Sequence, residues 1–309
     1  MKVSAVCSPD RDGFRGYFYD VPSSGRCMVI VLGDDGNDFM SKACARWFFK
    51  YQNCSVLCIG LRTDGKEDPG INLWNLNQIE SAVNWLHGRS IQKIGICGMS
   101  IQAAMALSAA ARIPFFSLVI AFSPCDFVPW GFLHGPAGKE KNAEYPTGNS
   151  AFTWNGEALP FQAANLSRDD YYKTFQGDSK RFLEMHSKGV FEKSEAVSPV
   201  PENAWIPAEN IRGALILVGA EDDSMWNSTR YIHRMRRRLT DKHFMFPVRA
   251  LTYRYGTHLL LPQRMVMDAL PVIGGFIYLM FASGRKNHQA CRSSRIHLDR
   301  ELSSFLQNW

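Results

Sequence analysis

Along the chain, short runs of apolar and β-branched residues alternate with longer amphipathic segments. Each apolar run ends in glycine or polar residues, which is typical of strands buried on both faces. Alternation of such strands with helices predicts an α/β fold with a mostly parallel central sheet and helices on both faces. The predicted strands span residues 27–33, 54–61, 93–98, 115–122, 214–220 and 246–253, and a further strand within residues 13–21 is expected at the sheet edge.

The segments between these strands have apolar residues at the helical spacing, as in Ile79, Val83 and Leu86. We predict helices over residues 39–51, 73–87, 100–111, 226–239 and, in the tail, 287–307.

The alternation stops between residues 123 and 210, where Pro, Gly, Asn and Ser are frequent. A long insertion after a central strand is usually functional. We interpret residues 1–309 as a single domain in which residues 123–210 form a cap-like insertion beside a substrate pocket.

Composition narrows the class of protein. The chain has 309 residues, 46% of them hydrophobic, which is enough for one large core. Its start has no apolar run of signal-peptide type, and the most apolar later stretch, residues 269–281, is too short to span a bilayer. Eight cysteines lack the paired spacings of zinc sites. These features predict a cytoplasmic protein without a membrane span or metal site, whose cysteines are free, buried thiols.

The net charge of +6 is modest and is partly concentrated in Arg234, Arg236, Arg237 and Arg238. We interpret this cluster as a solvated helix face rather than a phosphate-binding patch. The basic residues are not interleaved with aromatic residues in the manner of a nucleic-acid reader, so no nucleic-acid partner is expected.

The most informative motif follows the strand at 93–98. Gly98-Met99-Ser100-Ile101-Gln102 leads directly into an alanine-rich helix, which is the strand–turn–helix pattern of a nucleophile elbow. Gly98 supplies a small residue before the serine, whereas Gln102 stands where a glycine is usual. Two alternatives exist: Ser100 could cap the helix only, or Cys97 could be the nucleophile, although its place inside the apolar run predicts buried core.

A serine hydroxyl needs a histidine base, and that base needs a carboxylate to orient it. The chain order in this kind of site is nucleophile, acid, histidine. Asp223 is the predicted acid, because it lies three residues before Trp226, the start of the next predicted helix; Asp222 is then expected either to support the site from behind or to face solvent. Of the eight histidines, only His258 follows a glycine-containing turn directly after a late strand.

The oxyanion that forms during acyl transfer needs preorganised backbone donors. The amide of Ile101, directly after the nucleophile, is the first predicted donor. The second is expected from the loop Gly33-Asp34-Asp35-Gly36, with the amide of Asp34 as the choice. The carboxylates of this loop are expected to point away or to bind a cationic group of the substrate.

Several segments, in order, resemble the C-terminal catalytic domain shared by acyl-CoA thioesterases and bile acid-CoA:amino acid N-acyltransferases, a branch of α/β hydrolases close to dienelactone hydrolase. The similar segments are VLGDDGNDFMSK, GICGMSIQAAMAL, AFSPCDFVPWGF, SAFTWNGEALPF, IPAENIRGALILVGAEDDSMW and YGTHLLLP.

The resemblance implies the α/β-hydrolase fold, a triad of Ser100, Asp223 and His258, and reaction on activated acyl groups through an acyl-enzyme. In this family serine goes with hydrolysis and cysteine with transfer to an amine. Three features depart from the family: the amino-terminal β-sandwich is missing, Gln102 replaces a small residue, and Asp34-Asp35 replaces a glycine-rich loop. An acidic loop beside the nucleophile would disfavour a polyanionic CoA ester.

The sequence therefore predicts a serine hydrolase that acts on a small acyl thioester or ester, with CoA thioesters among the candidates, and that needs no metal or organic cofactor. The alternatives are an acyltransferase that uses an amine or alcohol acceptor, and a non-catalytic α/β-hydrolase relative that only binds ligands or partners.

Overall fold

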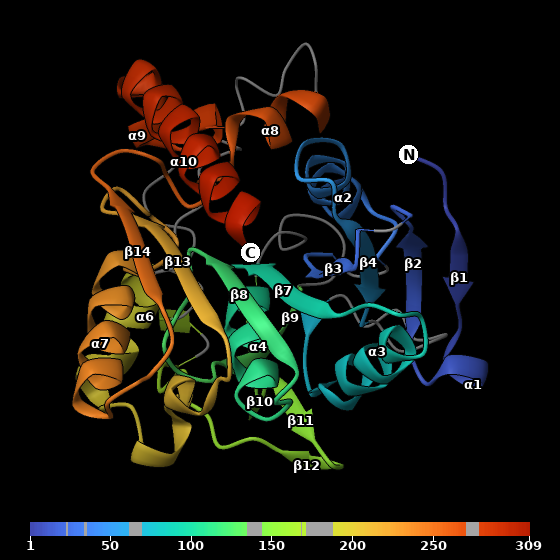
Figure 1. Cartoon of the computed structure of the whole chain (residues 1–309). Coiled ribbons are helices and arrows are strands. Elements are labelled where there is room, and N and C mark those ends of the chain that lie inside the picture. Colours follow the sequence, from blue (N-terminus) through green and yellow to red (C-terminus); the bar gives the residue numbers. More distant parts are fainter. Residues whose placement is uncertain are drawn as a thin grey trace.

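The computed structural model describes residues 1–22, 24–33, 36–61, 70–134, 144–167, 169–170, 188–269 and 278–309. Within this part of the chain, an eight-stranded sheet with the order β1-β2-β4-β3-β7-β8-β13-β14 runs through the molecule (Figure 1). β2 is antiparallel to both of its neighbours, and the strands from β4 to β14 pair in parallel. The strands of this sheet are β1 (Ala5–Cys7), β2 (Arg15–Tyr19), β3 (Arg26–Val31), β4 (Ser55–Gly60), β7 (Lys93–Met99), β8 (Phe116–Phe122), β13 (Ala214–Ala220) and β14 (Val248–Tyr253).

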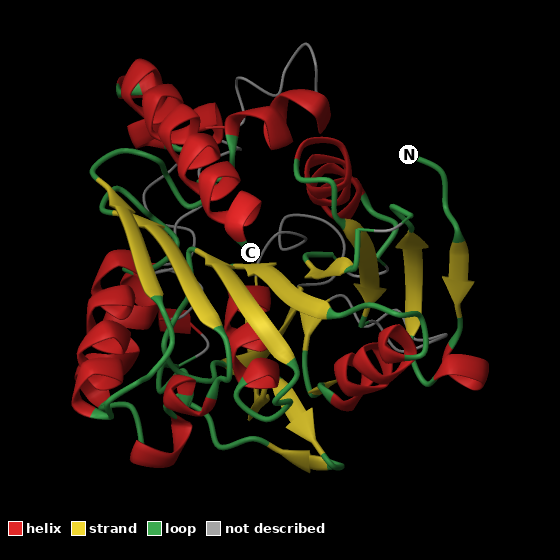
Figure 2. Ribbon diagram, viewed as in Figure 1, coloured by secondary structure: helices red, strands yellow, loops and turns green. Residues whose placement is uncertain are grey.

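Helices cover both faces of the sheet (Figure 2). One face carries α2 (Phe39–Tyr51), α8 (Gln263–Ala269) and α10 (His288–Asn308). The other face carries α3 (Asn77–His87), α4 (Ile101–Ala110) and α7 (Ser228–Asp241). Two short helices, α1 (Pro9–Asp12) and α9 (Ala282–Lys286), lie at the periphery. The fold class is therefore the predicted one.

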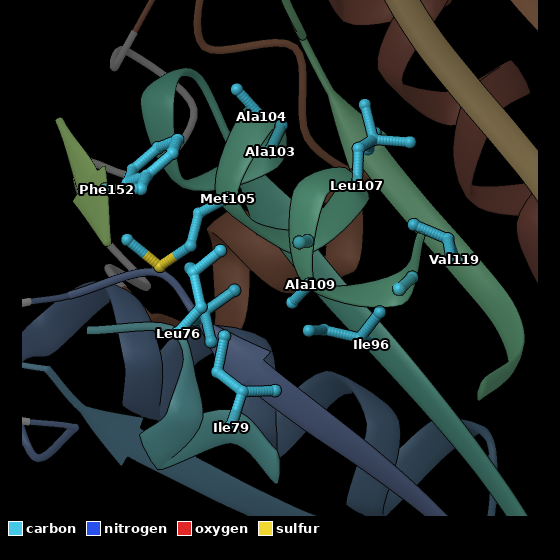
Figure 3. Packing of buried hydrophobic residues seen from close by; sticks show 14 of the residues in the cluster. Leu76, Ile79, Ile96, Ala103, Ala104, Met105, Leu107, Ala109, Val119 and Phe152 are labelled. Carbon is cyan, nitrogen blue, oxygen red and sulfur yellow. The ribbon is translucent and has the colours of Figure 1, made fainter. Parts of the chain in front are cut away.

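The sheet divides the apolar core into two clusters. Val29 and Val31 of β3 face the cluster of α3, α4 and α7, whereas Met28 and Ile30 face that of α2, α8 and α10. All four side chains are fully buried, which explains why the strand is apolar at every position after Arg26. Figure 3 shows the first cluster, in which alanines of α4 pack closely on β7 and β8.

The stretch between β8 and β13 contains short elements. They are β9 (Trp130–His134), β10 (Glu144–Ser150), β11 (Phe152–Trp154), β12 (Glu157–Ala158), α6 (Lys188–Val197) and the 3₁₀ turns Glu202–Ala204 and Ala208–Asn210. Two strands from earlier in the chain, β5 (Gly70–Ile71) and β6 (Trp74–Asn75), join them in two small three-stranded sheets. Phe127, Trp130 and Phe152 are buried in the same cluster as α4, so this stretch shares the main core.

Apart from shifts of one or two residues at the ends of elements, two predictions differ from the structure. The strand at Arg15–Tyr19 is not at the sheet edge, because β1 pairs outside it. The helix predicted from residue 73 begins at Asn77, since Trp74–Asn75 instead pairs with β11. The apolar stretch 269–281 lies largely outside the described residues. Among the residues that are described, no helix is both long and apolar enough to cross a bilayer.

Candidate active site

Ser100 lies at the sharp turn between β7 and α4. Its backbone has φ 60° and ψ −129°, a conformation that residues with a side chain rarely adopt. Its amide donates a 2.8 Å hydrogen bond to the carbonyl oxygen of Phe122 at the end of β8. The Ser100 side chain makes no capping hydrogen bond with α4, so helix capping alone does not account for the hydroxyl.

Gly98 is required by the close approach of the two limbs of this turn. A Cβ atom at position 98 would lie 2.2 Å from the carbonyl oxygen of Gln102. The side chain of Gln102 itself is half-buried, and its backbone makes the tight contact. The elbow therefore needs glycine on the strand side and accommodates a larger residue on the helix side.

The structure brings the three predicted side chains into mutual contact. Nε2 of His258 is 2.8 Å from Oγ of Ser100, and Nδ1 is 2.9 and 3.0 Å from the two carboxylate oxygens of Asp223. Asp223 and His258 are only 2% and 4% exposed. Because an ionised carboxylate can only accept hydrogen bonds, the imidazole proton belongs on Nδ1, and Nε2 is left to accept from the hydroxyl.

The sheet explains this convergence. Ser100, Asp223 and His258 follow the carboxyl ends of β7, β13 and β14, and β8 lies between β7 and β13. From β3 the chain continues to β4 on one side and later returns to β7 on the other side, so the direction in which strands are added to the sheet reverses between β3 and β7. In open α/β sheets, ligand sites form outside the carboxyl ends of strands at such a switch point.

Asp223 is fixed from its own loop. One of its oxygens accepts hydrogen bonds from the amides of Met225, at 2.9 Å, and Trp226, at 3.3 Å. The ring of Trp226 meets the ring of His258 edge to face, with centroids 5.5 Å apart. The loop after β13 thus holds Asp223 through backbone amides and contacts His258 through the ring of Trp226.

Asp222 supports the loop that carries His258. One of its oxygens accepts from the amides of Gly256, at 2.9 Å, and Thr257, at 2.8 Å, and the other from the hydroxyl of Ser283, at 2.7 Å. Thr257 is fully buried and has φ 61°, an unfavourable conformation for a β-branched residue. Of the two expectations for Asp222, the structure favours support of the site over exposure to solvent, because its carboxylate holds the loop that carries His258.

Ser123 is a part of the site that the sequence analysis missed. Its hydroxyl donates to the carbonyl oxygen of His258 at 2.7 Å, and its own carbonyl accepts from the indole N–H of Trp226 at 3.0 Å. Its amide donates to the carbonyl oxygen of Val218 on β13 at 2.6 Å. The sequence shows only a polar residue directly after a mostly apolar central strand, which by itself does not indicate these contacts.

Of the two predicted oxyanion donors, only Ile101 lies within the described residues. Ile101 is the first residue of α4, so its amide has no acceptor within the helix. Asp34 and Asp35 lie outside the described residues. On the far side of that loop, Asp38 caps α2, because its side chain accepts from the amide of Ser41 at 3.0 Å.

All eight cysteines are free and buried, as predicted, and Cys97 lies inside β7. Burial raises the pKa of Cys7 to about 11 and holds the pKa of Cys125 further above its ordinary value. Within the described part of the chain, no cluster of three or more His, Cys, Asp or Glu side chains is arranged to hold a metal ion.

The interpretation of the arginine cluster on α7 as a solvated face is only half right. Arg236 and Arg237 are exposed, but Arg234 binds Asp126, at 2.6 and 2.8 Å, and Glu195, at 2.6 Å. Burial alone would lower the pKa of Arg234, yet these carboxylates hold it above its ordinary value. Arg238 likewise pairs with Glu209. The partners are distant in sequence, so the helical pattern could not reveal them.

A mostly parallel sheet with a serine on a strained strand-to-helix turn, and with an acid and a histidine after two later strands, defines an α/β hydrolase. The comparisons agree with this class. Residues 143–265 match the family model "BAAT / Acyl-CoA thioester hydrolase C terminal", a stretch that includes Asp223 and His258. The resemblance drawn from the sequence is confirmed there, and the match supports an ester or thioester hydrolase.

Solved structures share the fold. An esterase of Pyrococcus furiosus superposes with a TM-score of 0.53 at 14% identity, covering 100% of this chain and 96% of that chain. A second crystal form of the esterase gives a TM-score of 0.50 at 13% identity, covering 100% and 98%. No curated protein matches the sequence.

Proposed function

We propose that this protein is a serine hydrolase that cleaves an acyl thioester or ester through an acyl-enzyme. Ser100 is the nucleophile, His258 the general base and acid, and Asp223 the residue that orients the imidazole. The observation that carries the proposal is the continuous contact from Asp223 through His258 to a serine on a strained turn. A serine that served only the fold would gain nothing from this backbone conformation.

In the proposed reaction, Oγ of Ser100 attacks the acyl carbonyl carbon while Nε2 of His258 takes the hydroxyl proton. The negative charge that develops on the carbonyl oxygen is met by the amide of Ile101 and by a second amide, for which Asp34 remains the choice. His258 then returns the proton to the leaving thiol or alcohol. Water, deprotonated by the same imidazole, then attacks the acyl-enzyme. The bond from the acyl carbon to Oγ breaks, His258 gives its proton to Oγ of Ser100, and the acid leaves.

The substrate class rests on the family match, whose description names thioester hydrolysis. A small acyl compound, with CoA thioesters among the candidates, fits this match. The stretch 123–210 would form one side of the acyl pocket as a cap. Two of its rings connect it to the site, because Trp130 stacks on Phe191 and Phe191 contacts Trp226. Trp226 in turn contacts the ring of His258. The protein is proposed to work in the cytoplasm without a cofactor.

A fluorophosphonate probe tests the nucleophile. We expect one covalent adduct on Ser100 in the folded protein, and no adduct in Ser100→Ala. Ser108→Ala is a matched control, because this hydroxyl is fully buried on α4 and makes no hydrogen bond within the described part of the chain. Labelling that persists in Ser100→Ala, or absence of any adduct in wild type, would overturn the proposal and favour a protein that only binds ligands.

Acyl transfer is the second candidate, because the sequence resembles a domain that acyl-CoA thioesterases share with bile acid-CoA:amino acid N-acyltransferases. A panel of acyl-CoA and simple ester substrates, with and without glycine or taurine, separates the two. We expect free acid as the product in both cases and the same total turnover. Formation of an amide at the expense of free acid would assign the protein to the transferases.

A further inference from the structure

A groove opens at the edge of the sheet opposite the catalytic residues. It has a volume of about 420 Å³ and lies where the chain enters β8, β13 and β14, so the strand arrows of Figure 1 point away from it. Its lining includes Arg112, Arg212, Lys242 and His243. β13 has seven residues, so the groove and the catalytic edge are separated by roughly 20 Å along the strand direction.

Large apolar side chains are exposed beside these cations. Met245 is 87% exposed and Phe246 36%, and both line the groove; Phe115, which directly follows its residue Pro114, is 52% exposed. Burying such side chains is favourable, and a group of them at one edge of a soluble domain marks an interaction surface. We call Phe115, Met245 and Phe246, with Arg212 and Lys242, the amino-edge patch.

The loop that carries Met245 is held in place by the backbone. The amide of Lys242 bonds to the carbonyl of Arg238 at 2.9 Å, that of His243 to Thr240 at 3.1 Å, and that of Phe244 to Leu239 at 2.9 Å. The rings of Phe244 and Phe246 then pack 5.6 Å apart. The exposed side chains therefore project from a fixed turn and need little ordering before they bind.

The charge of the patch is not neutralised from within. Glu209 is the only acid among the described residues that line the groove, and Arg238 already holds both of its oxygens, at 2.7 and 2.9 Å. Arg212 and Lys242 are exposed. Protruding apolar side chains flanked by cations complement one kind of surface in both respects: the boundary between anionic headgroups and acyl chains.

We propose that the amino-edge patch docks the protein on membranes that contain anionic phospholipid. Met245, Phe246 and Phe115 insert at the headgroup boundary, and Arg212 and Lys242 lie against the lipid phosphates. In this orientation the carboxyl edge of the sheet, with Ser100, faces the aqueous phase. The enzyme would then meet water-soluble acyl substrates while it is held at the membrane surface.

Sedimentation with vesicles of phosphatidylcholine, with and without phosphatidylglycerol, tests this inference directly. Wild type is expected to bind the mixed vesicles and to bind pure phosphatidylcholine far more weakly. A cation near an anionic bilayer strengthens binding by about fivefold, so Arg212→Gln/Lys242→Gln should lower the partition coefficient by about 25-fold. Met245→Ser/Phe246→Ser should lower it by at least about tenfold, because the inserted apolar area is lost.

Arg292→Gln/Arg300→Gln is the matched control, since it removes two exposed cations from α10 on another part of the surface. It should change binding less than about threefold. Circular dichroism and turnover of a soluble ester show that each variant remains folded. The inference is overturned if wild type ignores the mixed vesicles, if the apolar variant binds like wild type, or if the α10 variant loses as much. Binding of an oligonucleotide without binding of vesicles would likewise overturn it.

Discussion

Asp222 offers the sharpest test of how the histidine is positioned. In Asp222→Ala, the amides of Gly256 and Thr257 and the hydroxyl of Ser283 lose their shared acceptor. A hydrogen bond to a charged group contributes about 1.5–3 kcal/mol, and water replaces part of it in a half-buried loop, so we expect a loss of about 3 kcal/mol in the free energy of unfolding. For a chain of this size, that corresponds to a fall in Tm of about 5 °C.

Asp222→Ala should also lose activity while it is still folded. Thr257 keeps its positive φ only while its surroundings enforce it. Without Asp222 the loop relaxes and moves the His258 imidazole, and a displacement of about 1 Å costs about 100-fold in rate. We therefore expect kcat for a chromogenic p-nitrophenyl ester to fall about 100-fold at a temperature where the variant is fully folded. KM should stay within about threefold, because the loop carries the base rather than the pocket.

A conservative variant and a neighbouring control variant accompany this test. Asp222→Asn keeps an oxygen acceptor and should lose no more than about tenfold in kcat, since only the charge is removed. Glu221→Ala removes the adjacent, exposed acid and should behave like wild type. If Asp222→Ala retains the kcat of wild type, or if Glu221→Ala is equally impaired, Asp222 does not position the histidine.

Three further outcomes are expected. Ser100→Gly should unfold at a higher temperature than Ser100→Ala, with a difference of about 1 kcal/mol in the free energy of unfolding, because φ 60° suits glycine; equal melting temperatures would argue against strain at the elbow. Gly98→Ala should lose at least about 3 kcal/mol, since its Cβ meets a carbonyl oxygen at 2.2 Å, whereas Gly88→Ala, with a nearest contact of 3.6 Å, should be tolerated. Ellman's reagent should react only slowly with the native protein, and it should react with all eight thiols once the protein is unfolded. A thiol that reacts rapidly in the native protein would contradict their burial.

The sequence predicted the elements whose signal is local. β3, β4, β7 and β13 are apolar at nearly every position because both faces are covered, and this pattern is visible without tertiary information. β1, with three residues, and β6, with two, carry too little pattern to be recognised. They exist because partners elsewhere in the chain supply hydrogen bonds.

The candidate site shows the same division. Ser100 and His258 could be predicted because a turn after a strand leaves a mark in the sequence, and Asp223 because of its offset from Trp226. Ser123 could not, since its contacts reach His258, 135 residues away. The link between Arg234 and Asp126 also joins residues that are 108 positions apart. Asp34 stays a prediction, because it lies outside the described residues.

The junction at Ser123 has a consequence for refolding. Ser123 directly follows β8 and forms hydrogen bonds with the backbone of β13, the indole of Trp226 and the carbonyl of His258. These bonds can form only after chain segments separated by about a hundred residues have met, and such long-range closures come late in folding. Recovery of the proposed hydrolysis of a p-nitrophenyl ester after dilution from denaturant should therefore lag behind recovery of helical circular dichroism. The return of turnover would then report when the bonds between Ser123 and these distant segments have formed.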